Sequence, residues 1–320
     1  MTLRAALVGA GAVATRHARV LSGFGDVEVV AVHDANRPAA EVVGAAFGVP
    51  VADDLAGVLT ARPDAVWLCV PPFAHGELEH AVIAAGLPFF VEKPLAADLK
   101  VAESVADAVA EAGLPTATGY HWRHLDTVAR ARTALEGRSV RLLDARWWGT
   151  TPPPAWWSQA ATSGGQVVEQ ATHVLDVVRL LAGEVTEVIG AHAASSREGR
   201  DVPDATAAVL RFASGAVGTV STSCVLPAPT AAGVDLAADG LAVSLTETSL
   251  RMTAPDGWTH ASEPLVDPRE AVDRAFVDLL TTGVAAPGLV DVAEALRTHR
   301  LACAITEATR TGTTVRVTEA

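Results

Sequence analysis

Residues 3–34 read LRAALVGAGAVATRHARVLSGFGDVEVVAVHD, and this stretch determines how the N-terminal part of the chain folds. An apolar run ends at a glycine-rich turn, a helical Ala-rich pattern follows, and a β-branched run comes next. In the turn, Gly9, Gly11 and Ala14 follow the pattern G-x-G-x-x-A, whose small residues allow close approach of a pyrophosphate and of the helix. The helix presents free N–H groups and its positive dipole end to phosphate. The stretch therefore predicts a β-α-β unit that binds a dinucleotide.

An acidic residue, Asp34, ends the second apolar run. A carboxylate at this place accepts hydrogen bonds from the adenosine ribose hydroxyls and repels a 2′-phosphate, which favours NAD over NADP. Arg37 lies three residues further on and would favour NADP if it turned toward the ribose; its alternative role is at a solvated helix start. We predict NAD as the cofactor, with NADP as the less favoured alternative.

Further apolar runs alternate with amphipathic helical patterns as far as residue 120. Strands are predicted at 3–8, 27–32, 65–70, 88–91 and 115–118. Helices are predicted at 12–21, 37–47, 76–85 and 98–112. Strands that are apolar throughout and alternate with helices indicate a parallel sheet covered on both faces. We therefore predict a doubly wound Rossmann domain over residues 1–120.

The pattern changes beyond residue 120, where we predict a second, α+β domain over residues 121–320. A connecting helix is predicted at 123–136. Strands separated by turn signals are predicted at 139–149, 185–194, 205–213, 216–224, 233–238, 241–246 and 249–253. No long helical pattern interrupts residues 185–262, which indicates a mostly antiparallel sheet. Helices predicted at 268–282 and 289–310 could pack back on the first domain.

Charge and cysteine content exclude several classes of partner. The chain has 37 acidic and 24 basic side chains and a formal net charge of −13, which argues against nucleic acid and against a polybasic membrane contact. Three widely spaced cysteines, without a C-x-x-C pair, fit a reducing compartment. Residues 1–15 resemble a short signal peptide, but their removal would delete the first strand. We expect a cytoplasmic protein without membrane contact.

Four separated motifs carry a family resemblance. Glu92-Lys93-Pro94 closes the strand at 88–91 and resembles the E-K-P signature of the Gfo/Idh/MocA oxidoreductases. The other motifs are Val70-Pro71-Pro72 with His75, the segment GYHWR at 119–123, and the segment SGGQVVEQATHVLD at 163–176. Their order along nearly the whole chain is more specific than any one of them.

The resemblance implies an oxidoreductase that uses NAD(P) to oxidise a secondary alcohol of a sugar, cyclitol or related small molecule, or to reduce the matching ketone. Lys93 and His173 correspond to the family's lysine and histidine, one of which moves the hydroxyl proton. The residue types suit this task, because a base must take the proton and an ammonium stabilises developing alkoxide charge. Only Lys93 and Lys100 are lysines among the 24 basic residues, and arginine does not release a proton near neutral pH. The resemblance also implies a homodimer or homotetramer.

Glu169, His173 and Asp176 have the spacing i, i+4 and i+7, which places them on one face if the segment is a single helix. The commoner family pattern has Asp where Glu169 stands, so Glu169 is predicted to contact substrate, to orient His173 or to turn away. Asp176 is more typical of a structural role. The three residues could ligate a metal, but we predict none, since the family needs none and no second ligand cluster appears.

The predicted site comprises a catalytic set, Lys93, His173 and Glu169, and two sets of contact residues. Cofactor contacts are expected of Gly9, Gly11, Ala12, Val13, Asp34, Val70, Pro71, Pro72, His75, Glu92 and Lys93. Substrate contacts are expected of Lys93, His121, Trp156, Glu169 and His173. Structural roles remain open for His75 and His121. The Trp-rich residues 147–160 are predicted to form a substrate-side wall with Trp156 or Trp157 near the nicotinamide, and a packed loop or a subunit contact remains the alternative.

Two other functions remain open. One is a glycosidase on the same fold that keeps NAD bound and oxidises the sugar transiently. The other is a non-catalytic sensor that binds a dinucleotide and a partner protein. The presence of both Lys93 and His173 favours catalysis over the sensor.

Overall fold

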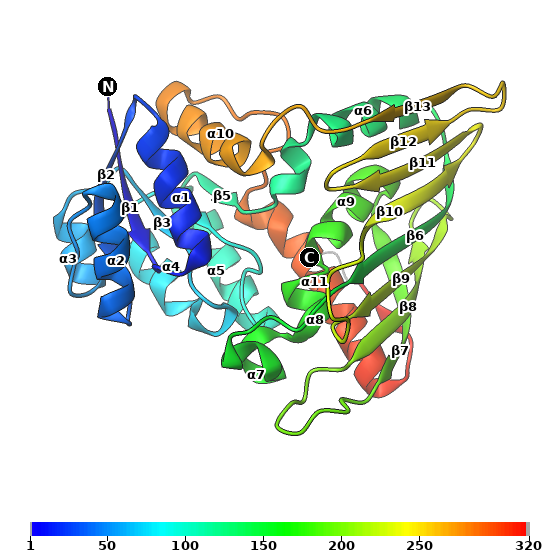
Figure 1. Cartoon of the computed structure of the whole chain (residues 1–320), viewed down its shortest axis with the longest axis horizontal. Coiled ribbons are helices and arrows are strands. Elements are labelled where there is room, and N and C mark those ends of the chain that lie inside the picture. The colour runs from blue at the N-terminus through cyan, green and yellow to red at the C-terminus, as the bar shows by residue number, and fades with distance from the viewer. Residues whose placement is uncertain (1, 318–320) are drawn as a thin grey trace. The chain divides into compact units, whose positions relative to one another are not determined.

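The structure is a computed structural model that describes residues 2–317, with the side chain of residue 231 left out (Figure 1). It contains two compact units. The first comprises Met1–Ala96, Lys100–Tyr120 and Arg269–Ala295, and the second comprises Ala97–Leu99, His121–Pro268 and Leu296–Ala320. Each unit is described by itself below.

A parallel sheet forms the centre of the first unit. Its strands are β1 (Leu3–Val8), β2 (Val27–His33), β3 (Ala65–Leu68), β4 (Phe89–Val91) and β5 (Thr116–Thr118), in the order β2-β1-β3-β4-β5. All four pairings are parallel, which confirms the predicted sheet. Its helices are α1 (Ala12–Gly23), α2 (Arg37–Phe47), α3 (Leu55–Thr60), α4 (Glu77–Ala84) and most of α5 (Leu99–Ala112), with the short 3-10 helix η1 (Pro72–Ala74). Helix α3 was not predicted.

Both faces of this sheet are buried, which explains why its strands show no alternation. Trp67 and Phe90 point to one face, Val66 and Phe89 to the other, and all four side chains are fully buried. A segment from the C-terminal part of the chain completes the first face. Phe276 of helix α10 (Pro268–Thr282) contacts the Trp67 ring edge-to-face, with ring centroids 5.3 Å apart.

A nine-stranded sheet dominates the second unit. Its strands are β6 (Val140–Trp148), β7 (Val185–Ala193), β8 (Ala205–Phe212), β9 (Val217–Ser223), β10 (Ala231–Ala238), β11 (Leu241–Thr246), β12 (Leu250–Thr253), β13 (Thr259–Ser262) and β14 (Val315–Arg316). The order is β13-β12-β11-β10-β6-β9-β8-β7-β14, and only the pair β6–β9 is parallel. The predicted, mostly antiparallel sheet is therefore confirmed, although β13 and β14 were not predicted.

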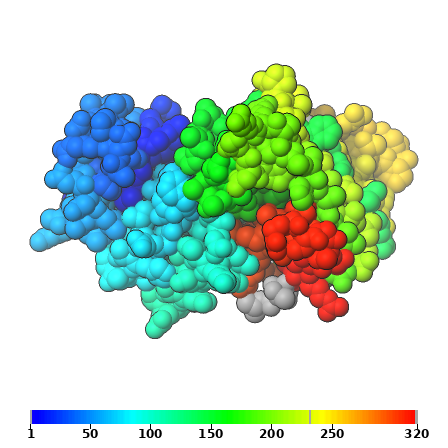
Figure 2. All heavy atoms as spheres, turned by 90° about the horizontal axis from the view of Figure 1, so that it is seen from below, coloured from blue at the N-terminus to red at the C-terminus, as the bar shows by residue number. Residues whose placement is uncertain are grey.

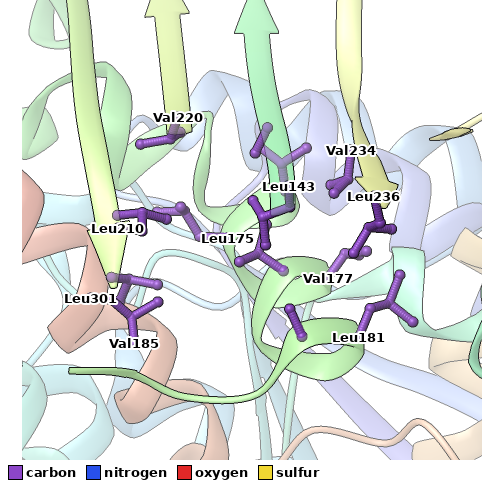
Figure 3. Close-up of a cluster of buried hydrophobic side chains, with 14 of the residues drawn as sticks. Leu143, Leu175, Val177, Leu181, Val185, Leu210, Val220, Val234, Leu236 and Leu301 are labelled. Atoms are coloured by element: carbon purple, nitrogen blue, oxygen red, sulfur yellow. The ribbon is translucent and has the colours of Figure 1, made fainter. Parts of the chain in front are cut away.

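Helices cover one face of the large sheet. They are α6 (Asp126–Leu135), α9 (Thr172–Ala182) and α11 (Val292–Thr311). The short helix η2 (His121–His124) precedes α6, and the short helices η3 (Ala155–Ser158), α7 (Ala160–Ser163) and α8 (Gly165–Glu169) lie between β6 and α9 in the chain. Figure 3 shows Leu175 and Leu181 of α9 among Leu143 and Leu236 of the strands. The end of α11 lies at the surface, where residues 310–314 are exposed (Figure 2, red).

The opposite face of the large sheet carries exposed apolar side chains. In β8 the buried Leu210 follows Val209, which is 49% exposed, as expected when successive residues point to opposite faces. Leu142, Ile189 and Val217 are similarly exposed on neighbouring strands. No helix among residues 2–317 is both long and apolar enough to cross a bilayer.

Candidate active site

The glycine-rich turn between β1 and α1 has the geometry of a phosphate cradle. Gly9 has a φ of 102°, and a Cβ there would lie 2.2 Å from the Cys69 carbonyl oxygen, so only glycine allows this approach to the end of β3. Gly11 caps α1 without a side-chain hydrogen bond, and the space where its Cβ would stand is open. The first N–H groups of α1, at the exposed Ala12 and Val13, therefore suit a pyrophosphate.

The Asp34 carboxylate is joined to this turn by a hydrogen bond. Its Oδ2 accepts from the Ala10 amide at 2.7 Å, and its Oδ1 accepts from the Asn36 amide at 2.7 Å. Arg37 instead directs its guanidinium to Glu41 and Asp53. The structure thus gives Arg37 the role at a helix start, where its charge is paired with two acids.

The turn after β3 buries a second candidate, His75. The His75 Nδ1 lies 2.6 Å from the Glu79 carboxylate, and the same carboxylate accepts from the Gly76 amide. Burial raises the pKa of Glu79, but the neighbouring His75 and the Gly76 amide lower it further, so the net shift is downward. Within residues 2–317 the buried His75 Nε2 has no hydrogen-bond partner. His75 therefore packs just before the start of α4, with its Nδ1 bound to Glu79. Beside it, Val70 and Pro71 are half-buried and Pro72 is buried.

The Glu92-Lys93 pair lies where β4 ends. The Glu92 side chain is buried, and its Oε2 accepts from the Lys93 amide at 3.1 Å. Its Oε1 lies 3.0 Å from His17 Nε2 and 3.5 Å from the Arg16 guanidinium. Burial raises the pKa of Glu92, but His17, Lys93 and Arg16 outweigh burial and lower it to about 2. Glu92 is thus a fully ionised buried carboxylate that holds the main chain at Lys93.

His17 was missed by the sequence analysis, as was its other partner, Asp273. The His17 Nδ1 lies 2.7 and 2.8 Å from the two Asp273 oxygens, and Trp67 Nε1 donates to the same carboxylate at 2.9 Å. Burial lowers the pKa of His17, but Asp273 and Glu92 raise it to about 9. His17 and Asp273 are titratable side chains on the otherwise apolar faces of two helices. This placement was the sequence signal that could have identified them.

In the second unit, aromatic rings surround His173. Trp147 and Trp122 stack against its imidazole at centroid distances of 5.9 and 6.4 Å, and His121 meets its edge at 4.7 Å. The His121 Nε2 lies 3.3 Å from the carboxylate of Glu247, in the turn between β11 and β12. The structure therefore brings together two predicted residues, His121 and His173. Trp122 and Glu247 were not predicted at the site, because separate elements contribute them. Trp147 belongs to the Trp-rich residues 147–160 that were predicted as a substrate-side wall, and it lies at the end of β6.

The predicted single helix through Glu169, His173 and Asp176 is wrong. Helix α8 ends at Glu169, a turn occupies residues 170 and 171, and α9 begins at Thr172, so the helical spacing does not extend across the break. Asp176 is fully buried and accepts two hydrogen bonds from Arg123, at 2.7 and 2.6 Å. Burial raises the pKa of Asp176 more than its cationic neighbours lower it. Asp176 thus serves the packing of its unit.

Glu169 instead meets the Trp-rich loop. The fully buried Trp157 donates from Nε1 to Glu169 Oε2 at 2.7 Å. The Arg200 guanidinium lies over the Trp157 ring, 5.8 Å from its centroid. Trp157 is therefore a packed residue that orients Glu169, whereas Trp156 is half-buried beside it. Among residues 2–317, no group of three or more His, Cys, Asp or Glu side chains could hold a metal ion.

Comparisons with known proteins match both halves of the chain. Residues 3–120 match a family described as "Oxidoreductase family, NAD-binding Rossmann fold", and residues 136–250 match the "GFO/IDH/MocA C-terminal domain". The chain is 30% identical over 229 residues to an inositol 2-dehydrogenase of Rhizobium meliloti (strain 1021), which covers 70% of this chain and 69% of that protein. It is 29% identical over 195 residues to a D-glucoside 3-dehydrogenase of Escherichia coli (strain K12), which covers 57% of this chain and 54% of that protein.

Among solved structures, the fold resembles levoglucosan dehydrogenase in complex with NADH and levoglucosan. The TM-score is 0.91 at 19% identity, over the full length of both chains. This likeness establishes the fold, and the matches over both halves of the chain establish the relationship. The chain belongs to the Gfo/Idh/MocA family of oxidoreductases with an NAD-binding Rossmann fold.

Proposed function

We propose that the protein is an NAD-dependent dehydrogenase of a secondary alcohol in a sugar, cyclitol or related polyol, with Lys93 and His173 handling the hydroxyl proton. The observation that carries the proposal is the fixed main chain at Lys93, which Glu92 holds at the end of β4. This end belongs to the carboxyl edge of the parallel sheet, the edge at which ligands bind in such folds. The glycine turn and Asp34 lie at the same edge.

The bound nicotinamide would accept or supply the hydride, and the residues of the chain do the rest. The α1 N-terminus holds the pyrophosphate, and Asp34 receives the ribose hydroxyls. A hydroxyl proton must leave as the hydride leaves, so one side chain takes this proton while another stabilises the oxygen. Lys93 and His173 are the pair with the chemistry to do both. Arg37 is already paired with Glu41 and Asp53, which supports NAD over NADP.

The surroundings of His173 support a neutral polyhydroxylated substrate. Glu247, which contacts His121 beside His173, offers a carboxylate acceptor for hydroxyl groups, and Trp147 offers an aromatic ring for C–H faces. Arg123, the arginine nearest the motifs, is bound to Asp176 and is not directed to a phosphate. Inositol, glucoside and levoglucosan dehydrogenases are the named relatives, so we extend this substrate class to the present chain.

The decisive experiment follows NADH formation in the near ultraviolet over a panel of inositols, hexoses, glycosides and sugar acids. A dehydrogenase forms NADH in proportion to product. A glycosidase of this fold would cleave a glycoside without net NADH, and a sensor would bind NAD without turning over any compound. Absence of NADH formation with every member of the panel, while NAD binds, would contradict the proposal.

We further propose a homodimer or homotetramer that works in the cytoplasm. The exposed Leu142, Ile189, Val209 and Val217 on the open face of the large sheet support association through this face. The cysteines Cys69 and Cys224 are buried thiols, which suits a reducing compartment. Light scattering after size exclusion tests the assembly, and a Val209→Glu variant should shift it toward monomer.

A further inference from the structure

A buried charge cluster in the first unit joins four elements. His17 of α1, Glu92 after β4, Asp273 of α10 and Trp67 of β3 are each less than 7% exposed. Their contacts form one chain from Trp67 to Asp273 at 2.9 Å, on to His17 at 2.7 Å, and on to Glu92 at 3.0 Å. The reaction as proposed above does not use His17, Asp273 or Trp67.

The chain of contacts defines the charge of His17. Carboxylates only accept hydrogen bonds, so an imidazole between two of them must donate from both nitrogens and is therefore the cation. This agrees with the pKa of His17, which Asp273 and Glu92 raise to about 9 against the effect of burial. Arg16 supplies a second positive charge, 3.5 Å from Glu92. Two cations thus balance two carboxylates, and the nearby Cys69 thiol stays neutral because burial raises its pKa.

The cluster ends at Glu92, the residue that holds the main chain at Lys93. One Glu92 oxygen contacts His17 and the other accepts the Lys93 amide. The carboxylate also occupies the space beside Gly119, where a Cβ would lie 2.6 Å from its atoms. A side chain confined in this way keeps a single orientation only while its charge is matched, because an unpaired buried carboxylate is strongly destabilised. The His17 cation supplies this match.

We propose that His17, held from behind by Asp273, is a positioning residue for the reaction: it fixes the Glu92 carboxylate, which in turn fixes the main chain at Lys93. The inference rests on the proposed role of Lys93. Misplacement of a reacting group by about 1 Å can cost about 100-fold in rate, so the effect falls on turnover more than on cofactor binding.

The test compares His17→Gln with His80→Gln, a matched change of a histidine that bonds Ser104 outside the cluster. We expect His17→Gln to lower kcat by about 10- to 100-fold and to change the Kd for NAD by less than about twofold. His80→Gln should keep the wild-type values. A wild-type kcat in His17→Gln would overturn the inference.

Two measurements separate positioning from a general loss of structure. Histidine NMR of the protein without cofactor should show one imidazole that titrates near pH 9 and disappears in His17→Gln. The wild-type kcat should fall as pH rises through about 9, and this fall should be absent in His17→Gln but present in His80→Gln. A shared alkaline fall in all three proteins, or no such NMR signal, would contradict the inference.

A double-mutant cycle connects the effect to Lys93. In a Lys93→Met background, His17→Gln should lower the residual turnover by less than about twofold, because its effect passes through Lys93. A fully additive loss would overturn the inference. If Lys93→Met keeps the wild-type kcat, the proposed function itself is contradicted. If Lys93→Met loses turnover but His17→Gln keeps the wild-type kcat, only the positioning role of His17 is contradicted.

Trp67→Phe provides a milder variant if His17→Gln does not fold. It removes one hydrogen bond to Asp273 and keeps an aromatic ring against Phe276. We expect kcat to fall about 3- to 10-fold, because Asp273 loses one of the hydrogen bonds that orient it toward His17, while the His17–Glu92 contact is kept. An unchanged kcat in a folded Trp67→Phe protein would count against the inference.

Discussion

Glu92 in the first unit and His173 in the second are both buried polar side chains at predicted site positions, yet different forces hold them. His17 and Arg16 hold Glu92 by charge, whereas Trp147 and Trp122 stack against His173. A charge network is lost when one of its members changes its charge, whereas ring packing rests mainly on apolar contact. We therefore expect the geometry around Lys93 to depend on the protonation of His17 and Glu92, and the position of the His173 ring to depend on its packing against Trp147 and Trp122.

The largest effect is expected of Lys93→Met, which tests the proposed function at the residue whose main chain is held by the Glu92 charge network. It removes the group that exchanges or stabilises the proton, and we expect kcat to fall about 10³- to 10⁴-fold. Lys93→Arg should be nearly as inactive, because arginine keeps its proton. Steady-state kinetics and NAD titration measure both effects. Substantial turnover in Lys93→Arg would show that Lys93 acts only through its charge.

The next largest effect is expected of His173→Phe, which tests the site where aromatic rings pack around His173. Phenylalanine keeps a ring against Trp147 and Trp122 but cannot exchange a proton, so kcat should fall about 100-fold. The melting temperature should change by less than about 4 °C, since packing is kept. His192→Gln, at an exposed position of the same unit, is the control. If His173→Phe retains full turnover, His173 is a packing residue.

The pH dependence of stability is a further way to test the contrast between the charge network around Glu92 and the ring packing around His173. His17 has a pKa raised from 6.5 to about 9, so its contribution to the unfolding free energy is complete below pH 6.5 and is lost as pH rises through 9. Glu92 has a pKa lowered from 4.5 to about 2, so its contribution is complete above pH 4.5 and is lost as pH falls through 2. We expect a loss on the order of 3 kcal/mol between pH 6.5 and 9, measured by urea unfolding. His17→Gln should abolish this slope, and His192→Gln should keep it.

The smallest effect is expected of Trp157→Phe in the second unit. The change removes the N–H that Trp157 donates to Glu169 at 2.7 Å and keeps the ring under Arg200. We expect KM for the polyol to rise about 10-fold with kcat changed less than about twofold, because a lost hydrogen bond to a charged group costs about 1.5 to 3 kcal/mol. Trp258→Phe, at a half-exposed position, is the control. An unchanged KM would show that the Trp157 hydrogen bond does not position Glu169 for substrate binding.

The sequence by itself determined the architecture and the local motifs of the candidate site. The parallel sheet was predictable because strands buried on both faces are apolar throughout, and the large sheet because its strands alternate or follow turn signals. The turn at Gly9 and Gly11 and the pair Glu92-Lys93 are local motifs, so they can be recognised from neighbouring residues alone. Helix-breaking at residues 170 and 171 was not predictable, since neither glycine nor proline marks it.

Only the tertiary structure decided which polar groups meet. His17 and Asp273 are 256 residues apart in the sequence. The residue pattern of each helix does not indicate which residue of the other helix it contacts. Trp157 meets Glu169, and Arg123 meets Asp176, in the same way. A buried charge is stable only beside its counter-charge, so the chain must bring such partners together, but the pairing is a property of packing rather than of local sequence.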